Sequence, residues 1–290
     1  KLKSYELGFV HDQGRSRQEK TSGPTFKREK WPQNLFFVTM TEYKKGLPVS
    51  AIAYPPREVR ESLAEILSKH KYLQAHLAES EKERMVTFYF DGRRDERFGG
   101  EDVEIIASPH VATYDKKPQM STFKVVNKFK KLLHSNKYHF FVLNFANADM
   151  VAHSGNISAT IKAIEVVDKS VGDLVNATLE RRGTVIITAD HGNAEELLSY
   201  PSAFYFVTSS SGTINTEHSN NPVPILIISR ELEGSPRALG RGTLADIAPT
   251  ILELMNLPAP QLMTGRNLLA RESTLEEAGK DQEHAGMNPA

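Results

Sequence analysis

Three segments of the sequence are apolar without the alternating polar side chains that a half-exposed strand requires. They are HFFVLNF at residues 139–145, TVIITAD at 184–190 and PVPILII at 222–228. Such runs are typical of strands buried on both faces, as in parallel sheets. Between the first two, apolar side chains repeat at helical spacing from Ile157 to Leu174. The pattern therefore predicts an α/β fold with a mostly parallel sheet and helices on both faces.

Shorter periodic segments extend this pattern toward both ends of the chain. Further strands are predicted at residues 35–39, 49–54, 85–90 and 103–107, and helices at 59–67, 126–133 and 246–255. The pair Pro55-Pro56 ends a strand and makes a plausible domain boundary. Residues 271–290 are polar and without periodicity, so we expect a loose tail there.

Composition narrows the class of protein. The chain has 290 residues, with 36 basic and 36 acidic side chains, and this balance gives no field that would attract nucleic acid or an acidic membrane surface. It has no cysteine, which excludes disulfides and thiolate metal sites and fits a reducing compartment. No run is long enough for a membrane span, and no signal peptide is recognised. Because residue 1 is lysine, we expect the chain to begin at a processing site or partway through a gene product.

Metal-ligand side chains recur at the ends of the apolar segments. Asp149 and His153 follow the first segment, Asp190 and His191 follow the second strand, and His218 comes just before the third. Mixed carboxylate and imidazole ligands suit Mn²⁺, Zn²⁺ or Fe²⁺. Five such residues are more than one four-coordinate ion with an open position would use, so the pattern predicts two metal ions.

Each residue also has a simpler interpretation. An aspartate near a helix start, such as Asp149, is often an N-cap, and an isolated histidine at a strand end is often only hydrogen-bonded. The adjacent pair Asp190-His191 needs a turn to bring both side chains into one pocket. Four further histidines lie in polar or helical segments and are predicted to be surface residues: His70, His76, His134 and His139.

With these residues in view, the sequence resembles the cofactor-independent phosphoglycerate mutases of the alkaline phosphatase superfamily. The resemblance is carried by NFANADMVAHSGN (144–156) and TADHGNAEE (188–196), and by LAESEKERMVTFYFDG (77–92) and TEHSNNPVP (216–224). It continues through LADIAPTILELMNLPAPQLMTGRNLL (244–269), so that it covers about residues 35–270 in the family's order.

The resemblance implies a role for each candidate residue. Asp149, His153 and His218 match the ligands of one metal, and Asp190 and His191 match two ligands of the other. It adds a residue that the pattern alone does not single out. Lys82 matches a catalytic lysine that contacts the transferring phosphoryl group, where a compact ammonium neutralises charge. By itself, Lys82 lies in a charged run and would pass as a solvated side chain.

The chain also departs from the family. Members begin with a strand that ends in a metal-binding Asp-Gly, followed by a serine nucleophile and an inserted transferase domain, and no segment here matches these. The resemblance thus implies an alkaline-phosphatase-like fold lacking its N-terminal portion. Residues 1–56 would be the remnant of the transferase domain, and residues 57–270 the metal-binding phosphatase domain. Ser154 is the serine closest to the ligands, and we interpret it as a local cap. No role is predicted for His110 or for the long loop 197–215.

The expected function follows from the resemblance. The parent enzyme would interconvert 3-phosphoglycerate and 2-phosphoglycerate, in glycolysis and gluconeogenesis, through a phosphoserine intermediate. It would use two divalent ions, with Mn²⁺ expected, and act as a cytoplasmic monomer on a small-molecule substrate, without nucleic-acid or membrane partners. Two alternatives stay open. One is another superfamily metalloenzyme, such as a phosphopentomutase or a phosphonate-handling hydrolase. The other is a truncated chain that binds metal without turnover.

Overall fold

The computed structural model describes residues 34–44, 46–199, 213–234 and 239–270. The chain divides into two compact units, Lys1–Pro56 and Arg57–Ala290. In the described part of the first unit, β1 (Val38–Thr39) pairs in parallel with β2 (Ala51–Ile52). The predicted tail at 271–290 lies outside the described residues. Within the described part of the chain, no helix is both long and apolar enough to cross a membrane.

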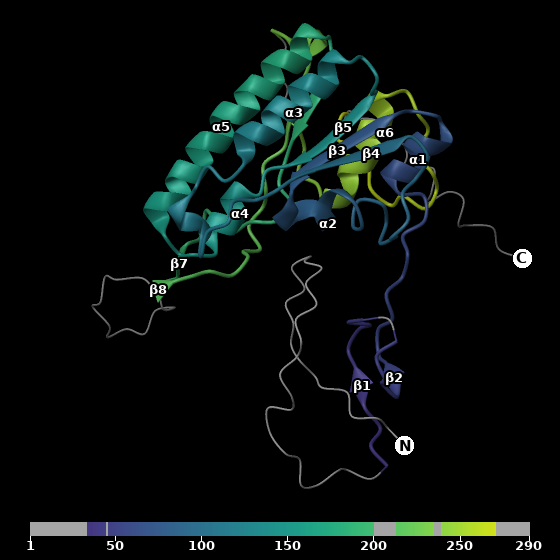
Figure 1. Ribbon diagram of the computed structural model, residues 1–290. Helices are drawn as coiled ribbons and strands as arrows, with labels where there is room; N and C mark the ends of the chain where they lie inside the picture. Colours follow the sequence, from purple (N-terminus) through teal and green to yellow (C-terminus); the bar gives the residue numbers. More distant parts are fainter. Residues whose placement is uncertain (1–33, 45, 200–212, 235–238, 271–290) are drawn as a thin grey trace, which may run out of the picture. The chain divides into compact units, whose positions relative to one another are not determined.

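A parallel three-stranded sheet forms the centre of the second unit (Figure 1). Strand β3 (Gln74–Glu79) lies between β4 (Glu101–Ile106) and β5 (Phe140–Asn144), and both neighbours run parallel to it. All six residues of β3 are buried. This agrees with the predicted α/β class and its mostly parallel sheet.

Helices cover both faces of this sheet (Figure 1). On one face, α3 (Thr122–His134) and α5 (Ile157–Glu180) share a core with the sheet that includes Leu77, Phe129 and Leu174. On the other face, α1 (Leu63–Lys69) and α6 (Ile247–Leu254) share a core built around Leu67 and Leu252. The predicted two-sided covering of the sheet is therefore confirmed.

The predicted strand at residues 85–90 is wrong. Helix α2 (Glu83–Val86) occupies its first part, and turns continue to Gly92, with Asp91 N donating to the Thr87 carbonyl oxygen at 2.7 Å. Among the apolar side chains of this segment, Phe90 packs in the core under α1. The true strand is β3, one segment earlier, where Gln74, His76 and Glu79 concealed a fully buried strand.

A second, antiparallel pair lies beyond α5. Strand β6 (Val185–Ile187) pairs with β9 (Leu226–Ile228), and Ile187 lies opposite Leu226. Between them, β7 (Leu198–Ser199) pairs with β8 (Thr213–Ile214). The remaining short elements are α4 (Asn147–Ala152) and the 3₁₀ turns Ser80–Lys82, Tyr114–Lys116, Arg230–Leu232 and Leu244–Asp246.

Candidate metal centre

Two neighbouring parallel strands bring Lys82 and Asp149 together. Strand β3 ends at Glu79 and leads directly into the 3₁₀ turn that contains Lys82, while β5 ends at Asn144 and leads into α4, which contains Asp149. The carboxyl ends of neighbouring parallel strands lie on the same side of the sheet, and ligands of such folds bind there. Lys82 Nζ donates to Asp149 Oδ2 at 2.6 Å, and both side chains are mostly buried.

Two histidines meet the other oxygen of Asp149. His153 is one turn of helix farther along, and its Nε2 lies 3.1 Å from Asp149 Oδ1. His218 Nε2 lies 3.2 Å from the same oxygen and 3.2 Å from His153 Nε2. The structure thus brings together Asp149, His153 and His218, whose ligand atoms converge on one point.

The antiparallel pairing of β6 and β9 explains how His218 reaches this point. His218 precedes β9 in the chain. In an all-parallel sheet, a residue that precedes a strand lies at the opposite end of the strands from residues that follow a strand. Because β9 runs antiparallel to β6, the start of β9 lies beside the end of β6. Residues before β9 and residues after β6 therefore lie at the same end of this strand pair.

The three ligand atoms fit a divalent cation. His153 Nδ1 donates to the Thr216 carbonyl oxygen at 2.7 Å, so Nε2 is the ring nitrogen that faces the Asp149 carboxylate. Ligands of a tetrahedral site with bonds of 2.0–2.2 Å lie roughly 3.4 Å apart, close to the separations here. A ligating histidine whose other nitrogen donates to a carbonyl is also the usual arrangement.

Asp149 is held in its ionised form. Burial alone would raise the pKa of its carboxyl, but hydrogen bonds from Lys82 and Asn193, with the charge of Lys82, bring the pKa below its ordinary value. Asp149 is therefore not the helix N-cap of the simpler interpretation, since the cap position of α4 is Ala146 and the Asp149 carboxylate bonds across to other segments.

Asp190 and His191 lie beside this cluster without joining it. The His191 ring stacks on the His218 ring, with centroids 3.7 Å apart and planes at 19°. His191 Nε2 lies 3.6 Å from Asp190 Oδ2, and Asp190 is the more exposed of the two. The chain bends at residues 190 and 191. These two side chains provide a carboxylate and an imidazole next to the three-residue cluster.

Two residues that sequence reasoning did not single out hold the site together. Asn193 Nδ2 donates to Asp149 Oδ1 at 2.8 Å, so Asn193 and Lys82 orient the two carboxylate oxygens. Glu195 accepts hydrogen bonds from Ser219 Oγ, from Asn221 Nδ2 at 3.1 Å and from the Asn193 backbone at 2.8 Å. Burial would raise the pKa of Glu195, but these bonds lower it to about 2. Both residues lie in TADHGNAEE, whose closeness to Asp190-His191 was the available signal.

Ser154 makes only local contacts, as predicted for a cap. Its hydroxyl donates to the Val151 carbonyl oxygen at 2.6 Å and accepts from the Asn156 backbone at 3.3 Å. Gly155, next to it, has a φ of 68°, and a Cβ there would lie 2.2 Å from Ile214 Cγ2. The turn after His153 therefore packs directly against the segment that leads to His218.

His76, predicted to be a surface residue, is instead fully buried in β3. Its Nδ1 donates to the Val86 carbonyl oxygen at 2.7 Å, and burial lowers its pKa to about 4, so the ring is neutral. Asp91 and Glu101 are buried beside it, and burial raises the pKa of both carboxyls. Because Nδ1 is occupied by the Val86 carbonyl, we interpret this group as a polar part of the core.

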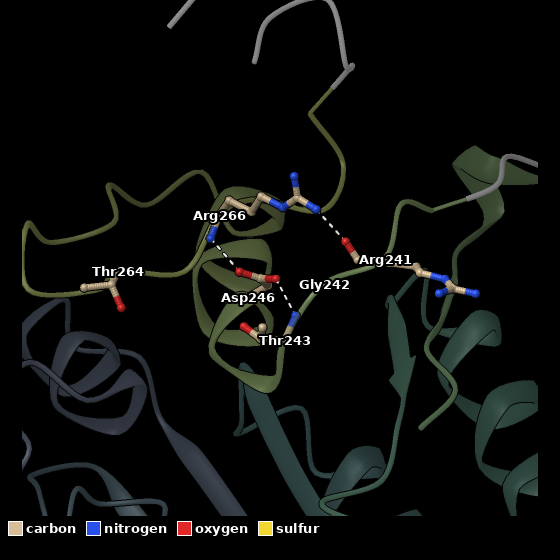
Figure 2. Close-up of a pocket in the computed structure, with 6 residues that line it drawn as sticks. All are labelled: Arg241, Gly242, Thr243, Asp246, Thr264 and Arg266. Atoms are coloured by element: carbon tan, nitrogen blue, oxygen red, sulfur yellow. Dashed lines mark hydrogen bonds between the residues drawn. The ribbon is translucent and has the colours of Figure 1, made fainter. Parts of the chain in front are cut away.

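A depression lies around Asp246, with a volume of about 500 Å³ (Figure 2). Figure 2 shows the Asp246 carboxylate between two backbone donors: Thr243 N at 2.7 Å and Arg266 N at 2.8 Å. Burial would raise the Asp246 pKa, yet these bonds bring it below its ordinary value. The aspartate of the LADIAPT segment therefore closes the loop before α6.

Comparisons with known proteins identify the family. The family profile described as "Metalloenzyme superfamily" matches residues 35–259. The 2,3-bisphosphoglycerate-independent phosphoglycerate mutase of Clostridium botulinum (strain Langeland) is 46% identical over 236 residues, which cover 81% of this chain and 44% of the relative. Phosphoglycerate mutase 1 of the same kind from Methanosarcina acetivorans is 43% identical over 247 residues, covering 85% and 45%.

A solved structure of similar fold comes from Leishmania mexicana. It is a crystal structure of phosphoglycerate mutase at low cobalt concentration, with a TM-score of 0.70 and 26% identity. The match covers 87% of this chain and 47% of that one. The chain thus spans about half the length of the relatives that it matches.

Proposed function

Because this chain belongs to the metalloenzyme superfamily, we propose that it is the metal-binding part of a cofactor-independent phosphoglycerate mutase. The observation that carries the proposal is the convergence of Asp149, His153 and His218 beside Lys82, in a sequence 46% identical to such a mutase. The reaction would be the interconversion of 3-phosphoglycerate and 2-phosphoglycerate. It would belong to glycolysis and gluconeogenesis, in the cytoplasm, with the complete enzyme acting as a monomer.

Each side chain has a proposed task. Asp149, His153 and His218 would hold one divalent ion, and Asp190 with His191 would contribute two ligands to a second. Mixed carboxylate and imidazole ligands suit Mn²⁺. The Leishmania mexicana mutase was crystallised with cobalt, a metal of the same chemical class. Such ions, when bound, supply positive charge that stabilises a transferring phosphoryl group.

Lys82 would supply charge from the protein itself. Its ammonium contacts Asp149 Oδ2 and lies near the carboxyl ends of β3 and β5, where substrate would bind. A lysine there can turn from the carboxylate toward a phosphoryl oxygen, because its stem is flexible and its three donors rotate. Asn193 would keep Asp149 oriented while Lys82 does so. The bond from His153 Nδ1 to the Thr216 carbonyl oxygen would keep Nε2 turned toward the ion.

Residues 1–56 and 57–270 have separate proposed origins. The first would be the remnant of a transferase domain and its linker, and the second the C-terminal part of the phosphatase domain. Support comes from the ordered sequence resemblance and from the share of the relatives' length that the chain spans. The nucleophile and the groups that hold glycerate would then come from outside the matched span.

The test uses a full-length chimera. Residues 35–270 of this chain replace the matched span of the Clostridium botulinum mutase, and conversion of 3-phosphoglycerate is followed by coupling to enolase with Mn²⁺ supplied. We expect turnover that is lost with His153→Ala. Absence of turnover in a folded, metal-loaded chimera would contradict the proposal. Metal content and circular dichroism of the His153→Ala variant, taken together, separate loss of the ion from loss of the fold.

A further inference from the structure

Three buried polar residues meet next to the segment that follows Lys82. His76 lies on β3 and Glu101 on β4, which are neighbouring parallel strands, and Asp91 lies in the turns after α2. One side-chain nitrogen or oxygen of each residue lies within 4.8 Å of those of the other two. His76 is completely buried, Asp91 is 1% exposed and Glu101 is 7% exposed. Two carboxyl groups are therefore buried together beside an imidazole that is neutral.

This pair of carboxyl groups favours one negative charge over two. Among the described residues, Asp91 Oδ1 and Glu101 Oε1 have no hydrogen-bond partner. Two carboxylates this close in the core repel, and one of them then keeps its proton. Burial and the charge of Glu101 raise the pKa of Asp91, whereas the charges of Arg97 and Arg94, in the loop before β4, oppose them less strongly. A proton on Asp91 supplies the donor that Glu101 Oε1 lacks.

The same three residues hold the segment that follows Lys82. Lys82 is the N-terminal cap residue of α2, and His76 Nδ1 donates at 2.7 Å to the carbonyl oxygen of Val86, the last residue of that helix. Turns continue to Asp91, whose backbone N–H donates to the Thr87 carbonyl oxygen at 2.7 Å. The segment from Lys82 to Asp91 is therefore attached to β3 in its middle and ends in the buried carboxyl pair.

We propose that the Asp91–Glu101 pair is a pH-sensitive latch for the segment that begins at Lys82. With one shared proton, the pair keeps Asp91 in the core, and the segment stays closed against β3. When that proton is lost, the two carboxylates repel, and the segment opens so that Asp91 reaches water. Lys82 then loses its fixed position beside Asp149, to which it donates at 2.6 Å in the closed form. The latch does not depend on which reaction the complete protein catalyses.

Hydrogen exchange tests the latch in the 290-residue chain. Protection of the backbone amides of residues 87–93 is measured by mass spectrometry at pH 5 and pH 8 and corrected for the intrinsic exchange rate. Because the pKa of Asp91 is about 7 in the closed form and 3.8 ordinarily, opening becomes more frequent as pH rises from about 4 to about 7. We expect a loss of protection of at least about tenfold between the two pH values, with roughly 100-fold as the upper limit.

Two variants remove the titrating pair in different ways. Asp91→Asn and Glu101→Gln each leave one ionisable carboxyl in the core, so protection of residues 87–93 should be nearly the same at both pH values. Asp168→Asn, at an exposed position of α5, is the control and should behave as the parent chain does. Unchanged protection in the parent, or an equal loss in the parent and in both variants, would overturn the latch.

Urea distinguishes opening of this segment from unfolding of the whole chain. A local opening exposes little surface, so exchange through it is nearly independent of low urea concentrations, whereas exchange through global unfolding accelerates with urea. The amides of α5 serve as the reference for global unfolding. If residues 87–93 exchange with the same urea dependence as α5 at pH 8, the segment has no opening of its own, and the proposal is refuted.

Amine labelling then reports the position of Lys82. Its side chain is 11% exposed in the closed form. Acetylation of Lys82 at pH 8 is measured relative to the exposed Lys169 on α5, so that the reactivity of the reagent cancels. We expect this ratio to be at least about tenfold higher in the parent chain than in Asp91→Asn. Equal ratios, despite lost protection of residues 87–93, would show that the turns open without moving Lys82 and would refute the coupling.

Discussion

Replacement of Asp91 by asparagine is expected to stabilise the folded chain above neutral pH. Burial, together with the nearby Glu101 carboxylate, raises the pKa of the Asp91 carboxyl from 3.8 to about 7. Asp91 is 1% exposed, and its Oδ1 and Glu101 Oε1 are buried without a hydrogen-bond partner. An asparagine has nearly the same shape and cannot ionise, and its amide adds a donor beside Glu101.

The sign and size follow from the two pKa values. Above about pH 4 the unfolded chain releases the Asp91 proton, whereas the folded chain keeps it up to about pH 7. The contribution of Asp91 to the free energy of unfolding therefore falls as pH rises from about 4 to about 7, and it is constant at higher pH. At about 1.36 kcal/mol per pKa unit, the full loss is about 4 kcal/mol, which is an upper bound. We expect Asp91→Asn to recover about half of this at pH 8, because a buried amide also needs partners.

Urea denaturation at pH 5 and pH 8 measures this effect. The variant should unfold at higher urea than the parent chain at pH 8, and the difference should shrink at pH 5. Asp168→Asn, at an exposed position of α5, is the matched control and should change neither midpoint. The reasoning is refuted if Asp91→Asn unfolds earlier than the parent chain at pH 8, or if the parent is equally stable at both pH values.

Three further predictions concern the site. Lys82→Met in the chimera keeps most of the apolar stem and should lower kcat by at least about 100-fold with unchanged metal content; wild-type turnover would return Lys82 to the role of a solvated residue. Asn193→Ala should weaken metal affinity by about 10–100-fold, as loss of a group that orients a ligand does, and calorimetric titration with Mn²⁺ would show it; unchanged affinity would contradict the orienting role. The 290-residue chain alone should not convert 3-phosphoglycerate in the enolase-coupled assay, and turnover that disappears with Ser154→Ala would make Ser154 the nucleophile.

The sequence predicted the elements with strong apolar periodicity and missed those whose burial involves polar side chains. Strand β5 and helix α5 were found because their side chains are almost uniformly apolar or strictly periodic. Strand β3 was missed because Gln74 and His76 satisfy their polar atoms inside the core, with Gln74 Nε2 donating to the Ala64 carbonyl oxygen at 2.9 Å. Local sequence patterns do not show hydrogen-bond partners that come from distant segments.

The residues of the candidate metal site were also predictable only where their contacts are local in sequence. Asp149 and His153 are one helical turn apart, so their convergence could be predicted from spacing alone. His218 comes from a segment 65 residues farther along and reaches His153 only through the antiparallel β6–β9 pair. Asn193 and Glu195 act through contacts with Asp149 and Ser219 that no local pattern contains. Their roles required the folded structure.

The hairpin that precedes His218 frees part of the chain to vary in length. Ser219 N donates to the Gly192 carbonyl oxygen at 2.8 Å, Asn215 N donates to the Leu197 carbonyl oxygen at 2.9 Å, and β7 then pairs with β8. This ladder fixes the spacing between the His191 and His218 segments from within. Residues inserted or deleted between Ser199 and Thr213 would leave both histidines in register. A chain of this kind could therefore acquire new loop sequences there during evolution while its ligands stay in place.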